Sequence, residues 1–78
     1  MNFPNIERIT MNPDVMGGRP CIRGVRVTVG AITGLVASGA CFQKILELYP
    51  YIEEDDIKAA LSYATWRAEE YDLILPVA

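Results

Sequence analysis

The chain has 78 residues, of which 51% are hydrophobic, and it carries a formal net charge of −3. A chain this short is expected to form a single domain, residues 1–78, that buries only about 60% of the surface its unfolded form exposes. It holds two cysteines and no histidine, which excludes zinc-ligand spacing and histidine-dependent catalysis. No apolar run approaches the ~20 residues of a membrane span, and no secretory signal is recognisable. We therefore expect a cytoplasmic protein without membrane contact, metal or cofactor.

Charge is unevenly distributed along the chain. Residues 1–40 carry four arginines against two carboxylates, a balance of +2, whereas residues 41–78 carry three cations against eight carboxylates, a balance of −5. A basic front and an acidic back can attract unlike partners or bring copies together head to tail.

The N-terminal part predicts a β hairpin over about residues 7–29. Residues 7–11 alternate between polar and apolar side chains, and an Asn-Pro-Asp sequence at 12–14 ends this pattern, so a short strand is expected there. Residues 25–29 place a valine at every second position, which predicts a second strand paired with the first. Two strands alone are barely stable in water, so helices or a second copy should cover their apolar face.

The segment from residue 17 to residue 27 combines three glycines, one proline and three arginines. Glycine permits backbone angles that other residues reach only with strain, and arginine keeps its charge. Two interpretations stay open: a structured turn with solvated arginines, or a loop that binds nucleic acid. The segment is not a nucleotide-hydrolysing phosphate loop, because it lacks the Lys-Ser/Thr pair and precedes a strand.

Apolar residues recur at helical spacing in three later stretches and predict helices at about residues 29–38, 42–49 and 54–71. Together with the hairpin they predict a mainly α fold: a three-helix, helix-turn-helix-like bundle preceded by a short two-stranded β hairpin. The remaining tail, residues 72–78, is too apolar for a free end and should pack or pair as a strand.

The third predicted helix is apolar on two sides. One face is expected to join the core, while Ala59, Tyr63 and Trp66 lie on nearly the opposite side. Either Trp66 covers the hairpin of its own chain, or this side contacts another molecule. We expect a homodimer or a dimer of dimers. The predicted dimer or partner interface consists of Tyr63, Trp66, Tyr71, Leu73, Ile74 and Leu75.

The chemistry-bearing residues favour binding over catalysis. No nucleophile has a visible base, so the chain is predicted not to be an enzyme. The carboxylates at residues 53–56 suit the positive end of the helix dipole, and we expect capping there rather than metal binding. Because these carboxylates repel phosphates, DNA binding would depend on Arg19, Arg23 and Arg26, as phosphate clamps or readers of guanine.

A family resemblance covers roughly residues 7–65. It is carried by Ile9, Pro13, Gly17-Gly18-Arg19-Pro20-Cys21-Ile22-Arg23-Gly24, Arg26, Val29, Gly39, Ile45-Leu46, Tyr49-Pro50, Ile57, Ala59-Ala60-Leu61 and Tyr63-Ala64. This spacing resembles the domain-of-unknown-function family 433, described as predicted antitoxins of the VapB kind with a helix-turn-helix core. The chain departs from the family at Val25, where threonine is usual, and at Cys41 and Glu53, where hydroxyl residues usually cap the second and third helices.

The resemblance implies an antitoxin that neutralises a PIN-like ribonuclease toxin and represses its own operon through operator DNA. For the toxin contact we consider residues 69–78, because Leu73 to Leu75 could fill a groove and the preceding carboxylates could meet basic residues. The tail could equally pair within the homodimer. The alternative function is a small dimeric protein-interaction module with no DNA or toxin role.

Overall fold

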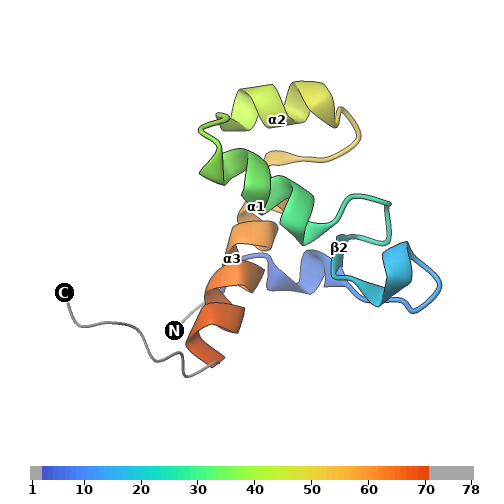
Figure 1. The fold of residues 1–78 in the computed structure, drawn as a ribbon. Coiled ribbons are helices and arrows are strands. Elements are labelled where there is room, and N and C mark those ends of the chain that lie inside the picture. The colour runs from blue at the N-terminus through green and yellow to red at the C-terminus, as the bar shows by residue number, and fades with distance from the viewer. Residues whose placement is uncertain (1–2, 71–78) are drawn as a thin grey trace.

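The computed structural model describes residues 3–70 and shows a short hairpin followed by three helices (Figure 1). In chain order the elements are the 3-10 helix η1 (Ile6–Arg8), β1 (Ile9–Thr10), the 3-10 helix η2 (Met16–Gly18), β2 (Cys21–Ile22), α1 (Val29–Ala37), α2 (Phe42–Leu48) and α3 (Glu54–Glu70). The expected fold class, mainly α with a two-stranded hairpin before three helices, is confirmed. Helices α1 and α2 each end one residue before the expected position.

The hairpin is shorter than expected. Strands β1 and β2 pair antiparallel over two residues each. The sequence predicts the second strand at residues 25–29, paired with the first. The strand that pairs with β1 instead lies earlier, inside the glycine- and arginine-rich segment, and within residues 25–29 Thr28 forms an isolated antiparallel bridge with Cys21. A turn at residues 23–24 sends the chain back, so that the Ile22 amide donates to the Val27 carbonyl at 3.0 Å. Strand β1 is also shorter than predicted, because η1 directly precedes it.

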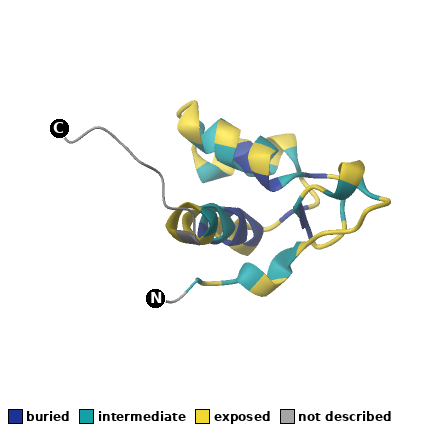
Figure 2. Cartoon of the chain, turned by 60° about the horizontal axis from the view of Figure 1, so that its bottom comes forward, coloured by how far each residue is buried: buried dark blue, intermediate teal, exposed yellow. Residues whose placement is uncertain are grey.

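The core lies where the helices meet the hairpin, and α3 packs against α1, η1 and both strands. Buried residues face this centre in Figure 2. Burial of apolar area stabilises a fold by about 25 cal/mol per Å², so this cluster holds the elements together far more than the two short strands do. The cluster consists of Ile22, Val27, Val29, Ile32, Ile45, Ile52, Ile57 and Ala60.

Helix α3 is buried along its first half only. Among the described side chains, none after Ser62 is buried. Ala59, expected on the outer side with Tyr63 and Trp66, is fully buried; that expectation is wrong because η1 packs against this helix. The Ser62 hydroxyl donates to the Pro4 carbonyl at 2.7 Å, which ties the N-terminal segment to α3. The later turns of α3 therefore extend beyond the core.

Helices α1 and α2 begin with nearly the same backbone geometry but differ in their caps. Thr28, with φ −79° and ψ 153°, accepts a hydrogen bond from the Ala31 amide at 3.1 Å on its hydroxyl oxygen. Cys41, with φ −79° and ψ 164°, makes no side-chain cap bond. A thiol is a weak acceptor, so the first turn of α2 lacks the hydrogen bond that stabilises the first turn of α1.

We expect Cys41→Ser to stabilise the protein by about 1 kcal/mol, because a hydroxyl in this geometry can accept a hydrogen bond from an amide of the first turn. Thr28→Ala should lower the free energy of unfolding by a similar amount. Chemical denaturation of both variants beside the parent measures these changes. An unchanged unfolding midpoint for Cys41→Ser would mean that packing alone determines the stability of α2.

Candidate functional site

The chain turns tightly directly after β2. Arg23 and Gly24 have positive φ values, 44° and 74°, and the Val25 amide donates to the Ile22 carbonyl at 2.8 Å. Two consecutive positive φ values are the pattern of a type I′ turn, whose second central position suits glycine. Arginine adopts this conformation only at a cost in free energy, so contacts of its side chain must compensate for the strain.

The side chain of Arg23 reaches the first turn of α3, where Asp56 has no exposed surface. Its Nε and Nη2 atoms donate to the two carboxylate oxygens of Asp56 at 2.9 and 2.8 Å, a bidentate geometry that strengthens an ion pair. Arg8 donates to the same carboxylate at 3.0 Å, and so does the Glu53 amide at 2.8 Å. These residues, Arg8, Arg23, Glu53 and Asp56, are termed the Asp56 cluster below.

The Asp56 cluster stays ionised at physiological pH. Burial by itself would raise the pKa of Asp56, but hydrogen bonds from Arg23, the Glu53 amide and Arg8 outweigh it and lower that pKa from 3.8 to about 2. The hydrogen bonds to Asp56 also raise the pKa of Arg8 and that of Arg23 above their ordinary values. Because Arg8 directly precedes β1 and Arg23 directly follows β2, the cluster joins both strands, at the open end of the hairpin, to α3.

The structure separates the three arginines that the sequence proposes for nucleic acid. The Arg23 guanidinium is held by Asp56, and its Nη2 also donates to the Tyr51 carbonyl at 3.3 Å. Arg19 and Arg26 are exposed, and within residues 3–70 their guanidinium groups make no hydrogen bond or ion pair. Arg23 therefore has a structural contact, while Arg19 and Arg26 are available to an anionic ligand.

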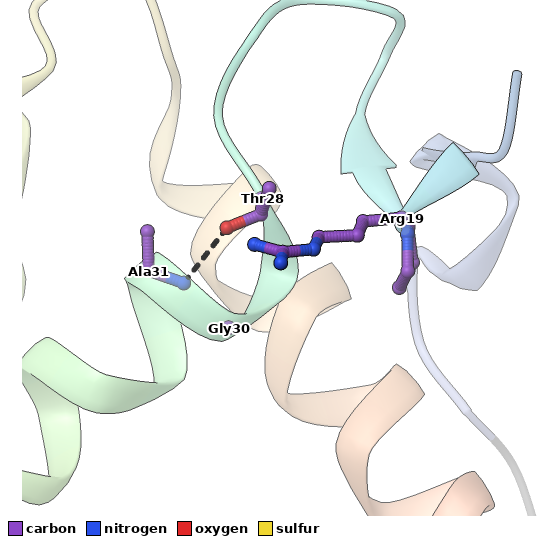
Figure 3. A pocket seen from close by; sticks show the side chains of 5 residues that line it. Arg19, Thr28, Gly30 and Ala31 are labelled. Atoms are coloured by element: carbon purple, nitrogen blue, oxygen red, sulfur yellow. Dashed lines mark hydrogen bonds between the residues drawn. The ribbon is translucent and has the colours of Figure 1, made fainter. Parts of the chain in front are cut away.

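Arg19 lies beside the amino end of α1, and its side chain extends across a hollow of about 420 Å³ (Figure 3). Pro20, Thr28, Gly30 and Ala31 complete the lining. Amides at the start of a helix carry partial positive charge and favour anions. Two amides of this first turn are already bonded, because Val29 donates to the Pro20 carbonyl and Ala31 to the Thr28 hydroxyl. Arg19 is therefore the group of this hollow that can contact a phosphate.

The two described members of the predicted interface lie on α3. The rings of Tyr63 and Trp66 are 5.8 Å apart between centroids, and with Ile6, Ile9 and Met11 they line an apolar hollow of about 180 Å³, termed the α3 groove. Trp66 thus lies beside the hairpin of its own chain and is still 37% exposed. The other members lie outside the described residues: Tyr71, Leu73, Ile74 and Leu75.

Sequence reasoning missed a second exposed apolar surface, at the junction of α2 and α3. Leu48 is 50% exposed and Tyr51 is 58% exposed. The exposed carboxylates Glu47, Glu54 and Asp55 are close to them in sequence, and the five residues together are termed the acidic corner. Glu54 and Asp55 each form a long ion pair of 3.8 Å, with Lys58 and Arg8 respectively. A signal was present, because Leu48 falls outside the spacing of apolar residues that marks the buried face of its helix.

Sequence reasoning also missed the contact between Arg8 and Asp56. Asp56 is interpreted from the sequence as a helix-capping carboxylate, and the hydrogen bond that it accepts from the Glu53 amide is of that kind, but the sequence contains no local signal for its arginine partners.

In the described part of the chain, no group of three or more His, Cys, Asp or Glu residues is arranged to hold a metal ion. No helix within residues 3–70 is long and apolar enough to cross a membrane.

We expect ionised Asp56 to contribute about 1 to 2 kcal/mol to stability at neutral pH, less than the full pKa shift because its arginine partners are partly exposed. The pKa of Asp56 is lower in the folded chain than its ordinary value, so this contribution is present above about pH 4 and is lost as the pH falls from 3.8 to about 2. Denaturant unfolding of the parent and of Asp56→Asn from pH 7 to pH 2 measures it. The stability gap should narrow below about pH 4; a pH-independent gap would contradict the expectation.

Comparisons with known proteins agree with this architecture. The DUF433 family model, described as a protein of unknown function, matches residues 9–64. The uncharacterized protein y4eO of Sinorhizobium fredii (strain NBRC 101917 / NGR234) is 38% identical over 58 residues, which cover 74% of this chain and 26% of that protein. The crystal structure of a DUF433 member from Anabaena variabilis ATCC 29413 is 30% identical with a TM-score of 0.74, covering 81% of this chain and 62% of that one. The chain thus spans about a quarter of its curated relative, and it belongs to the DUF433 family.

Proposed function

We propose that the protein is the antitoxin of a toxin-antitoxin pair and neutralises a PIN-like ribonuclease by binding it. The observation that carries this proposal is the acidic corner, an exposed apolar and aromatic surface with neighbouring carboxylates. Such a surface suits a protein partner with a basic face, because aromatic residues are enriched at interfaces and charge complementarity steers association. An enzyme that cuts RNA has a basic face of this kind, since it must bind a polyanion.

The charges left outside the Asp56 cluster support an acidic binding surface. With Arg8 and Arg23 paired to Asp56 and Glu53, residues 1–40 keep two arginines against two carboxylates. Residues 41–78 keep six carboxylates against three cations. Once these ion pairs are set aside, residues 1–40 have no net charge, while residues 41–78 keep a net negative charge. This balance favours a basic protein partner over nucleic acid.

The acidic corner is well placed to take a partner. Leu48 and Tyr51 are each at least half exposed, so their side chains are accessible without any rearrangement of the core. The backbone beneath them is held in place, because the Tyr51 carbonyl accepts a hydrogen bond from Arg23. A surface that is rigid and already exposed loses little conformational entropy on binding.

We expect the double variant Leu48→Ala/Tyr51→Ala to inhibit the ribonuclease encoded beside its gene at least about tenfold more weakly than the parent, because truncating central apolar interface residues costs roughly 1 kcal/mol or more each. Titration of the purified protein into a ribonuclease assay measures this. Met16→Ala, a change to another exposed apolar side chain, is the matched control and should inhibit like the parent.

Two results would count against this function. If the parent neither binds nor inhibits the adjacent ribonuclease, the antitoxin role is wrong. If Leu48→Ala/Tyr51→Ala inhibits as strongly as the parent, the toxin is contacted elsewhere. Circular dichroism should show unchanged helix content in both variants, because the truncated side chains lie on the surface.

DNA binding is a second candidate function, and the hollow beside α1 favours it. Arg19 crosses the hollow (Figure 3), and Arg26 is a second exposed arginine. Both could contact backbone phosphates, which would position the protein on operator DNA. Arg23 is not changed in this test, because its removal would disturb the Asp56 cluster, and a loss of DNA binding could then result from a loss of folded protein.

We expect Arg19→Ala/Arg26→Ala to weaken binding to labelled DNA from upstream of the gene and to reduce the slope of log affinity against log salt by about one for each arginine. Fluorescence anisotropy at several salt concentrations measures both quantities. Lys44→Ala, which removes an exposed cation on α2, is the control. Equal affinity and equal slope for the parent and the double arginine variant would rule out this DNA-contacting surface.

A further inference from the structure

The α3 groove is apolar along its lining yet open to solvent. Met11 is 62% exposed and Trp66 is 37% exposed, although large apolar side chains of these types favour burial. The hollow of about 180 Å³ between them has room for aliphatic side chains. An exposed apolar groove rimmed by aromatic side chains is a candidate binding surface.

The groove adjoins the part of α3 that the core leaves uncovered. After Ser62 no described side chain is buried, so the last two turns of α3 lack the packing of the first half. Helices in proteins are stabilised mainly by packing of an apolar face. A further segment packed on this half of α3 would cover Trp66 and complete the apolar surface.

The sequence directly after α3 has the chemistry that the groove requires. Residues 71–78 contain no lysine or arginine, and extended they span about 27 Å. Leu73 and Leu75 would lie on the same side of an extended segment, because side chains alternate along it. Pro76 then removes a backbone donor and ends any regular pairing.

Geometry favours a tail from another molecule over the chain's own tail. Tyr63 lies seven residues before Glu70, about 10 Å back along the axis of α3, and side chains on a helix lean further toward its amino end. A tail of the same chain would have to reverse direction immediately after Glu70. Asp72 is the one residue in 71–75 of a type that favours turns, and no glycine, asparagine or proline accompanies it.

We propose that residues 71–78 of one copy occupy the α3 groove of a second copy, with Leu73 and Leu75 as the side chains that enter it. The exchange is reciprocal, so each copy supplies one tail and one groove, as a two-fold symmetric dimer requires. The dimer does not use the acidic corner, which leaves that surface accessible. The test of this dimer therefore does not depend on whether the protein binds a toxin or DNA.

The test uses the full chain and its single tryptophan, Trp66. Sedimentation equilibrium should give twice the monomer mass of 8.6 kDa at high concentration and the monomer mass on dilution. Trp66 emission should shift to longer wavelength over the same concentration range, because dissociation exposes the ring. The tail variant Leu73→Asp/Leu75→Asp and the groove variant Met11→Asp should each weaken the dimer at least tenfold.

Two further samples test whether the dimer depends on the contact between the tail and the α3 groove. Met16→Asp makes the same chemical change at an exposed methionine outside the groove and should dimerise like the parent. A mixture of Met11→Asp with Leu73→Asp/Leu75→Asp keeps one intact tail and one intact groove. This mixture should form a heterodimer at concentrations at which each variant alone is monomeric.

Three results would overturn the proposal. Short-wavelength Trp66 emission that is independent of concentration but lost in the tail variant would mean that the tail covers its own groove. A dimer that resists both variants would place the interface elsewhere, and a parent that is monomeric throughout would exclude the exchange. Circular dichroism of Met11→Asp provides the folding control, because this side chain is mostly exposed.

Discussion

A carboxylate with no exposed surface must obtain its hydrogen bonds from the protein, and Asp56 obtains them from three segments of the chain. Arg8 lies before β1, Arg23 follows β2, and the Glu53 amide lies at the start of α3. Loss of one partner would leave charge buried or partly buried without compensation, which is costly. The hairpin has only two residues in each strand, so this cluster, together with the apolar core, determines where the hairpin lies.

The same cluster shapes the surfaces that remain for partners. It takes two arginines out of the basic half of the chain and leaves Arg19 and Arg26 as the arginines of the glycine-rich segment whose guanidinium groups make no hydrogen bond or ion pair within residues 3–70. It also neutralises part of the acidic first turn of α3, where Arg8 lies 3.8 Å from the exposed Asp55 as well. The hollow beside α1, the acidic corner and the α3 groove are therefore distinct surfaces on one small domain.

Helical periodicity was sufficient to predict the three helices, because their buried faces repeat at regular local spacing. The missing cap at Cys41 was also visible in the sequence. The Asp56 cluster was not, because Arg23 is 33 residues and Arg8 is 48 residues from Asp56, and no local pattern reports such a contact. The strand that pairs with β1 precedes the valine alternation at residues 25–29, because the chain turns at Arg23 and Gly24.

Arg23 serves the fold through Asp56, and a double-mutant cycle with Arg23→Gln and Asp56→Asn measures this coupling. The positive φ of Arg23 is the same in both backgrounds, so backbone strain cancels in the cycle. Denaturant unfolding of the four proteins gives the coupling between the two side chains. The account predicts that Arg23→Gln costs much less stability when Asp56 is already asparagine. Equal losses in both backgrounds would contradict it.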